Sequence, residues 1–306
     1  MHESNKYLRL IAPRYWLAWL GIGLLWLMTL LPYRGQLYLG KTIGNIFYFF
    51  PSKLKSISQV NIQLCFPELS STDQKHLVKK NFSSLGMGLI EAAMACWGSD
   101  RHIQHLIKFK LEGMDYLEKA LAKGKGAILL GPHFTCLEIV GRLISMYYAF
   151  AVMYRPHKKP FIAFIQERFR KKNYLQYIPR DHIRELIRAL HNNVAVWYAY
   201  DIDAGIKRSV FAPFFGIPTA SLTSVTRIVN LSGAAVIPIC FYRKEDDLSY
   251  EIRLYPALEN FPTGDAVEDG TQLNAALERA IRQKPEQYVW QYKRFKTRPL
   301  HEPRFY

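Results

Sequence analysis

Between residues 126 and 256, apolar strand-like runs alternate with helix-like segments. Apolar residues recur at helical spacing in 135–148, 160–173 and 214–233, the last being a loop followed by a helix that stops at Gly233. The strand-like runs occupy 126–132, 150–156, 194–201, 234–242 and 249–256. This alternation predicts an α/β fold, and runs that are apolar on both faces predict a mixed, largely parallel central sheet flanked by helices.

The N-terminal part carries a different signal, because residues 16–32 contain no charged side chain. As a helix rising ~1.5 Å per residue, this stretch would be about 25 Å long, at the short limit for crossing a bilayer. No small-residue cleavage pattern follows it, so we predict an uncleaved hydrophobic membrane-anchor helix within residues 1–34 and a single catalytic-size domain over 35–306. A helix lying in the membrane interface and a buried core helix are the alternatives.

The charge of the chain is strongly basic and unevenly distributed. The formal net charge is +16, with ten Lys and Arg against three acids in 153–188 and eight against two in 279–304. Such concentration favours an anionic partner, either a phosphorylated lipid or an acidic protein, over a merely solvated basic face. No zinc-finger spacing or RNA-binding motif accompanies it, so we predict no nucleic-acid partner.

The cysteines indicate neither a metal site nor a disulfide framework. They are scattered through the chain with no C-x-x-C pair, at Cys65, Cys96, Cys136 and Cys240. The cysteines therefore predict no zinc site, and for the chain as a whole we predict no metal and no cofactor.

Polar side chains follow three of the predicted strands, at the point where each strand ends. His133 comes after the first run, Arg155 ends the second, and Asp201 ends the third. Because reactive groups in parallel α/β sheets gather at the carboxyl ends of the strands, we expect these three residues to lie close together.

His133 and Glu138 form an H-x-x-x-x-E pattern that could support acyl transfer. Positions five apart lie about 140° apart around a helix, so the two side chains can meet only if His133 lies in the turn and Glu138 in the helix. A neutral histidine can remove a proton from an attacking hydroxyl, and a carboxylate on its other nitrogen would fix the tautomer. Cys136 offers an alternative thiolate nucleophile, but its place in an apolar helix pattern favours a buried core residue.

Three further groups of residues could bind substrate. Arg155 could supply positive charge to an oxyanion or a thioester carbonyl. Asp201 and Asp203 form an Asp-x-Asp pair that could coordinate a divalent ion, hold loop amides or pair with Arg155. Lys207 and Arg208, directly downstream, suit phosphate better than metal.

Several of these stretches together resemble one protein family. Taken in order, they resemble the late, lauroyl or myristoyl type acyltransferases of bacterial lipid A and lipopolysaccharide biosynthesis, which are lysophospholipid-acyltransferase-like. The matching stretches are "VNIQLCFPELS" at 60–70, His133 to Glu138, "YRP" at 154–156, "DIDAG" at 201–205, "SVFAPFFGIPTA" at 209–220 and "PEQYVWQYKRFKTRP" at 285–299. The resemblance covers nearly the whole chain, including the apolar N-terminal segment.

The resemblance implies transfer of a fatty acyl group from acyl carrier protein to a hydroxyl of an acyl chain on a phosphorylated, Kdo-bearing lipid A precursor. His133 would be the general base and Glu138 its partner, within a single acyltransferase domain at the cytoplasmic face of the bacterial inner membrane. The other implied substrate-binding residues are Arg155, Asp201, Asp203, Lys207, Arg208 and the Phe214–Phe215–Gly216 turn. The chain departs from the family pattern at Thr219 and Ala220 and in the lead-in "GPH", which bears on substrate preference.

Three other functions remain as alternatives. One is a membrane acyltransferase that acts on another phospholipid or glycolipid, with coenzyme A or acyl carrier protein as the acyl donor. A second is a metal-dependent glycosyltransferase that uses the Asp-x-Asp pair at 201–203. A third is a lipid-binding protein without catalytic activity.

Overall fold

The computed structural model describes residues 9–306, so the first eight residues of the predicted anchor lie outside the described residues. The helices are α2 (Trp16–Met28), α3 (Tyr33–Phe49), α4 (Lys53–Cys65), α5 (Ser71–Trp97), α6 (Asp100–Leu106), α7 (Met114–Leu121), α8 (Leu137–Ser145), α9 (Pro160–Ile165), α10 (Ile183–His191), α11 (Ser224–Ser232) and α12 (Ala266–Gln283). The strands are β1 (Phe109–Glu112), β2 (Ala127–Gly131), β3 (Ala151–Tyr154), β4 (Gln176–Pro179), β5 (Ala195–Ala199), β6 (Ser209–Phe214), β7 (Ile217–Leu222), β8 (Ala235–Arg243) and β9 (Tyr250–Leu254). Short turns of 3-10 or π helix complete the chain at Arg9–Ile11, Pro13–Tyr15, Gln166–Arg170, Lys171–Asn173, Ile206–Arg208 and Pro285–Gln287.

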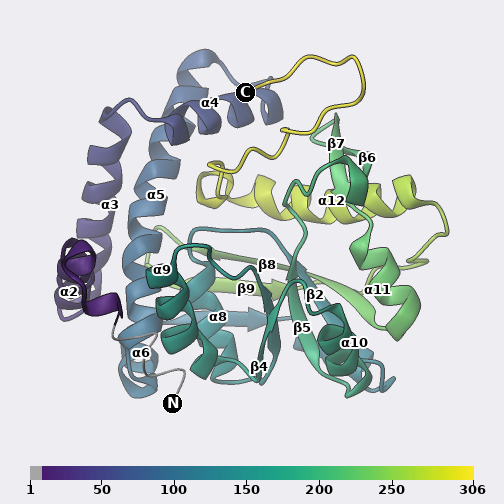
Figure 1. Cartoon of the computed structure of the whole chain (residues 1–306), viewed down its shortest axis with the longest axis horizontal. Coiled ribbons are helices and arrows are strands. Elements are labelled where there is room, and N and C mark those ends of the chain that lie inside the picture. The colour runs from purple at the N-terminus through teal and green to yellow at the C-terminus, as the bar shows by residue number, and fades with distance from the viewer. Residues whose placement is uncertain (1–8) are drawn as a thin grey trace.

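The main sheet has seven strands in the order β1-β9-β8-β2-β5-β3-β4. Every neighbouring pair is parallel except β8 with β9, which is antiparallel. Helices pack around this sheet (Figure 1), so the predicted α/β architecture with a mixed, largely parallel sheet is confirmed. The strand β2 is buried along its whole length, as its uniformly apolar run predicted.

Two parts of the sheet structure differ from the prediction. The segment 214–233 was expected to be a loop followed by a helix, but β6 and β7 form an antiparallel hairpin before α11 begins. Its turn places Phe215 at φ 51° and Gly216 at φ 74°, the positive angles that a tight hairpin requires. A phenylalanine rather than Asn or Asp at the first position hides the usual hairpin signal. The edge strands β1 and β4 were also not predicted.

The N-terminal segment does not form the long helix that the uncharged run suggested. Helix α2 ends at Met28, and the chain turns before Pro32, which precedes the first residue of α3. Within residues 9–306, no helix combines the length and hydropathy that a membrane crossing requires. The prediction of a membrane-anchor helix is therefore not supported, and α3 instead runs side by side with α5 along one flank of the molecule (Figure 1).

The backbones of α3 and α5 touch where glycines meet. A Cβ atom on Gly44 would lie 2.0 Å from the carbonyl oxygen of Phe82, and one on Gly86 would lie 2.0 Å from the carbonyl oxygen of Gly40. No side chain can fit between the two helices at these points, so glycine is required for the contact. This contact attaches α3 firmly to the long helix α5.

Candidate active site

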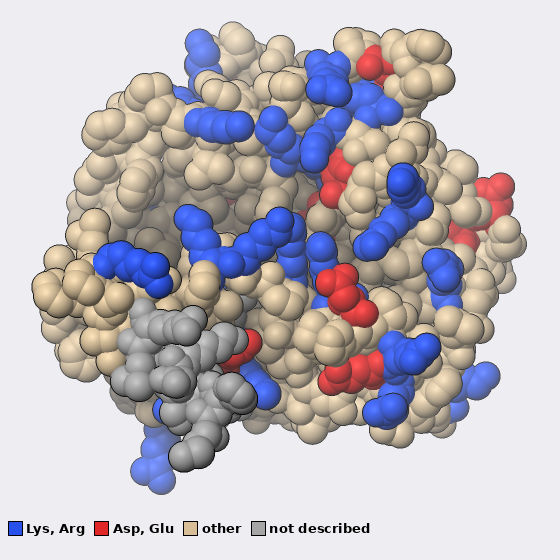
Figure 2. Space-filling view, viewed as in Figure 1, with Lys and Arg blue, Asp and Glu red and all other residues tan. Residues whose placement is uncertain are grey.

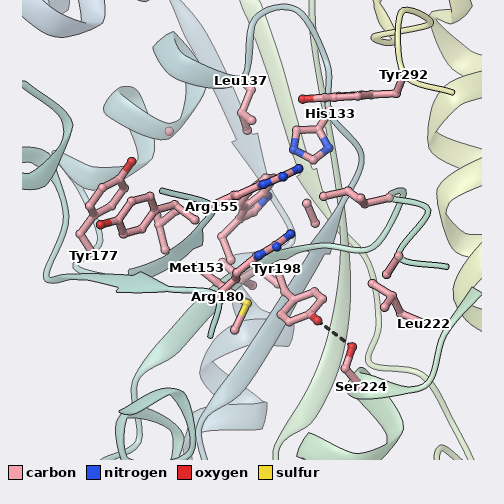
Figure 3. Close-up of a pocket in the computed structure, with 18 of the residues that line it drawn as sticks. His133, Leu137, Met153, Arg155, Tyr177, Arg180, Tyr198, Leu222, Ser224 and Tyr292 are labelled. Atoms are coloured by element: carbon pink, nitrogen blue, oxygen red, sulfur yellow. Dashed lines mark hydrogen bonds between the residues drawn. The ribbon is translucent and has the colours of Figure 1, made fainter. Parts of the chain in front are cut away.

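A cavity of about 1030 Å³ opens at the carboxyl ends of the central strands (Figure 3). Residues that follow β2, β3 and β5 all line it, including His133 and Arg155. Asp201 is completely buried directly beneath His133. The expectation that His133, Arg155 and Asp201 gather at one edge of the sheet is therefore confirmed.

The turn that carries His133 is held by hydrogen bonds on two sides. The carbonyl of His133 accepts from the Val289 N–H at 2.9 Å, and the Thr135 N–H donates to the Gln287 carbonyl at 2.8 Å. On the other side, the hydroxyls of Ser84 in α5 and Thr135 are 2.7 Å apart. The His133 backbone is thus fixed between α5 and the segment that follows α12, which we call the C-terminal segment (residues 284–306).

His133 has a carboxylate partner, and that partner is Asp201. The ring Nδ1 lies 2.6 Å from Asp201 Oδ1, and the His133 backbone N–H donates to Asp201 Oδ2 at 2.8 Å. Because a carboxylate only accepts, Nδ1 carries the proton, which leaves the lone pair of the neutral ring on Nε2. Among the described residues none hydrogen-bonds to Nε2, and His133 lines the cavity, so this nitrogen is available to a substrate.

The pKa values of the pair move apart as expected for a coupled acid and base. Burial would lower the pKa of His133, but the adjacent Asp201 carboxylate more than offsets it, so this pKa lies above its usual value. Burial would raise the pKa of Asp201, but the adjacent His133 ring holds it below its usual value. The buried carboxylate is thus placed to stabilise a protonated imidazole.

Glu138 has a different partner. It lies in the first turn of α8 while His133 lies in the preceding turn, as predicted, but its carboxylate forms an ion pair with Arg170. Glu138 is still close enough for its charge to raise the pKa of His133. Sequence reasoning missed Arg170, whose signal was its place in the basic stretch 153–188.

The two aspartates of the Asp-x-Asp pair face different partners. Both oxygens of Asp201 are taken by His133, whereas Asp203 accepts from the Thr297 N–H at 2.7 Å, the Thr297 hydroxyl at 2.8 Å and the Gly205 N–H at 2.9 Å. Asp203 therefore ties the C-terminal segment to the rim of the cavity. Since each carboxylate is engaged by a different part of the chain, their geometry gives the glycosyltransferase alternative no support.

Basic residues dominate the polar part of the cavity wall. Among the described residues, eight Lys and Arg line the cavity against three acids. The basic residues are Arg155, Arg170, Arg180, Lys207, Arg208, Arg227, Lys293 and Lys296. Figure 2 shows Lys and Arg gathered along the rims of a hollow on this face, and Figure 3 shows Arg155 and Arg180 extending into the cavity below His133. Such a wall favours anionic groups.

The Phe214–Phe215–Gly216 turn is not among the residues that line the cavity. Phe214 is fully buried, and the Phe215 ring packs against Phe66 at 5.3 Å between ring centroids. The Phe215 N–H donates to Glu278 Oε1 at 2.6 Å. The role predicted for this turn in shaping the acceptor site stays a prediction.

Cys136 is a core residue, as its place in the apolar pattern indicated. It lies at the start of α8, is completely buried, and its burial raises the pKa of the thiol. A raised pKa disfavours the thiolate that a nucleophile requires.

Two aromatic rings flank His133, with Trp197 at 5.8 Å and Tyr292 at 5.5 Å between ring centroids.

The chain is similar to known proteins over nearly its whole length. The family model of the bacterial lipid A biosynthesis acyltransferases matches residues 4–297. The lipid A biosynthesis palmitoleoyltransferase of Escherichia coli (strain K12) is 37% identical over 308 residues, covering 100% of both chains. The lauroyltransferase of the same organism is 37% identical over 298 residues and 97% of each chain, and its myristoyltransferase is 24% identical over 290 residues, 94% of this chain and 88% of the relative.

Proposed function

Because this chain belongs to the bacterial lipid A biosynthesis acyltransferase family and is an acyltransferase, we propose that it moves a fatty acyl group from acyl carrier protein to a hydroxyl of an acyl chain on a phosphorylated, Kdo-bearing lipid A precursor. The observation that carries this proposal is the His133–Asp201 pair at the wall of a cavity lined by eight basic residues of the described part of the chain. The pair supplies a base, and the basic wall suits both an acidic carrier protein and a phosphorylated lipid.

In the proposed reaction, Nε2 of His133 removes the proton from the acceptor hydroxyl as its oxygen attacks the thioester carbonyl. Asp201 holds Nδ1 and stabilises the imidazolium that forms. The tetrahedral intermediate then collapses, the C–S bond breaks, and the imidazolium returns the proton to the leaving sulfur. The substrate itself brings the nucleophilic hydroxyl, so no enzyme nucleophile is required.

The arginines have separate proposed tasks. Arg155 extends into the cavity below His133, where a guanidinium can stabilise the negative charge that develops on the carbonyl oxygen (Figure 3). Glu138 holds Arg170 at the cavity wall and adds to the negative potential around His133. In this scheme Glu138 acts beside the His133–Asp201 pair, and Lys207 and Arg208 receive phosphate at the rim.

Mass spectrometry tests the reaction directly. We expect a Kdo-bearing lipid A precursor incubated with the enzyme and acyl-loaded carrier protein to gain the mass of one acyl group. Parallel incubations with acyl coenzyme A and with enzyme-free membranes serve as controls. A gain with coenzyme A alone would exclude the carrier protein as donor, and no gain with any donor would exclude this acceptor.

We also propose that the N-terminal helices rest on the cytoplasmic leaflet of the inner membrane. Of the twenty-five large hydrophobic side chains exposed among the described residues, fifteen lie between Ile11 and Leu54. They include Trp16 in α2 and Phe47 in α3, and Lys41 lies on the same helix as Phe47. Exposed apolar and aromatic side chains near lysines are typical of helices that lie in the interface of an anionic bilayer.

Vesicle flotation tests this membrane contact. Replacing Phe47 and Phe50 together with glutamate should reduce binding to vesicles of anionic phospholipid about tenfold or more, because charge replaces two exposed rings. The matched control is Leu231→Glu, which places a glutamate on an equally exposed apolar position in α11. Unchanged flotation of the double variant, or an equal loss in the control, would contradict a membrane surface on α3.

A further inference from the structure

The cavity contains an apolar part that lies between α8 and one face of the sheet. The register of the strands places Leu129, Trp197, Val152 and Tyr177 on this same face, because Leu129 pairs with Trp197, Trp197 with Val152, and Val152 with Tyr177. The residues of α8 that line the cavity opposite them are Leu137, Val140, Gly141 and Ile144. We call this part of the cavity the α8 lobe.

The α8 lobe and the rim of the cavity offer different chemistry. Apart from Glu138 and Arg170, the walls of the α8 lobe are apolar or aromatic, whereas the other basic residues line the rest of the cavity. An unbranched hydrocarbon chain suits the lobe, and phosphate groups suit the rim. With the reacting carbonyl at His133, the acyl chain of the donor would extend from His133 along α8.

One contact narrows the α8 lobe partway along its length. A Cβ atom on Gly141 would lie 2.6 Å from the hydroxyl oxygen of Tyr174, while the nearest ring carbon of Tyr174 would lie at 3.5 Å. The Tyr174 ring is held from the other sides by Phe150 at 5.3 Å and Tyr177 at 6.2 Å between ring centroids. Only a residue without a Cβ leaves room for the Tyr174 hydroxyl against α8.

We propose that Gly141 and Tyr174 set the longest acyl chain that the enzyme transfers. This inference rests on the proposed function. Gly141 lies four residues after Leu137, or about 6 Å further along the helix at a rise of ~1.5 Å per residue, so the contact is well separated from the reacting carbonyl. Short chains end before the Gly141–Tyr174 contact, whereas longer chains must pass it towards Ile144 and Phe150, so the space left beside this contact limits the chain length.

The substitution Gly141→Ala tests the proposal. Its methyl group must push the Tyr174 ring away from α8 and into the space that a long chain uses. We expect kcat/KM for palmitoyl- and myristoyl-loaded carrier protein to fall about tenfold or more relative to decanoyl-loaded carrier protein, since one methylene in a hydrophobic pocket changes selectivity by about this much.

A second variant shows whether the effect comes from this contact. Tyr174→Phe removes the hydroxyl oxygen, which is the only atom of Tyr174 that lies closer than 3.5 Å to the added methyl. The double variant Gly141→Ala with Tyr174→Phe should therefore recover the transfer of long chains. Gly35→Ala is the matched control, because Gly35 also lies in a helix and has nothing within 4 Å of its Cβ position.

The outcomes separate this inference from the proposed function. If the wild-type enzyme transferred an acyl group from none of the donors, the proposed function itself would be wrong. Transfer by wild type together with an unchanged chain-length profile in Gly141→Ala would refute the inference alone. In the last comparison, the acyl chains of the acceptor are varied while the donor is kept fixed. If Gly141→Ala changed the chain-length profile for acceptors but not for donors, the α8 lobe would bind the acceptor, and the inference would be overturned.

Discussion

Replacing His133 with alanine is expected to lower kcat about a thousandfold while leaving the fold intact. Among the residues that the structure describes, His133 is the only base that lines the cavity with its second ring nitrogen held by a carboxylate. Loss of a positioned general base typically costs about 10²–10⁴-fold in rate. Single-turnover transfer of a radiolabelled acyl group, with thermal unfolding to verify the fold, measures both effects.

Cys136→Ala is the matched control for this prediction. Cys136 lies three residues from His133 and is completely buried, so its replacement should retain transfer. If a folded Cys136→Ala protein loses all transfer, direct attack by the acceptor hydroxyl is wrong. Equal transfer by wild type and His133→Ala would remove His133 from the mechanism.

Replacing Asp201 with asparagine should lower kcat about a hundredfold or more and change the pH profile. Asp201 accepts from two donors of His133, whereas an asparagine amide has one accepting oxygen, so its NH₂ group must face one of those donors. The tautomer with the lone pair on Nε2 is then no longer fixed, and the imidazolium loses its countercharge.

The sign of the pH effect follows from the pKa of His133. A base must be unprotonated, so activity rises as the pH rises through this pKa, which Asp201 holds above its usual value. Removing the Asp201 charge lowers the pKa, so the rising limb of kcat/KM moves to lower pH in Asp201→Asn even as the maximum falls. A limb that stays in place or moves to higher pH would contradict the assignment.

Glu138→Gln provides the comparison. Its charge also raises the pKa of His133, but less than Asp201 does, so the limb should move in the same direction by a smaller amount. Turnover should fall as well, because Arg170 loses its partner at the cavity wall. If Glu138→Gln shifted the limb further than Asp201→Asn, Glu138 rather than Asp201 would be the principal partner of His133.

The alternation of strands and helices was sufficient to predict where the site lies, but not which residues touch within it. Apolar runs that are buried on both faces become parallel strands, and their carboxyl ends share one edge, so His133, Arg155 and Asp201 could be placed together. Their pairing depends on the order of strands in the sheet, which puts β5 next to β2 although 68 residues separate His133 from Asp201. Periodicity carries no information about that order. The nearby Glu138 therefore looked like the natural partner, while its actual partner Arg170 lies beyond α9 in a π-helical turn that no spacing rule predicts.

The glycine contact between α3 and α5 determines how far the catalytic centre can reach. Since the two backbones touch at Gly44, α3 cannot swing relative to α5, and α5 is joined through Ser84 to the turn that carries His133. With α3 resting on the bilayer, as proposed, His133 is therefore held at one height above the lipid headgroups. An acceptor hydroxyl that lies at another depth has to be raised to that height, so the lipid rather than the enzyme makes the vertical movement.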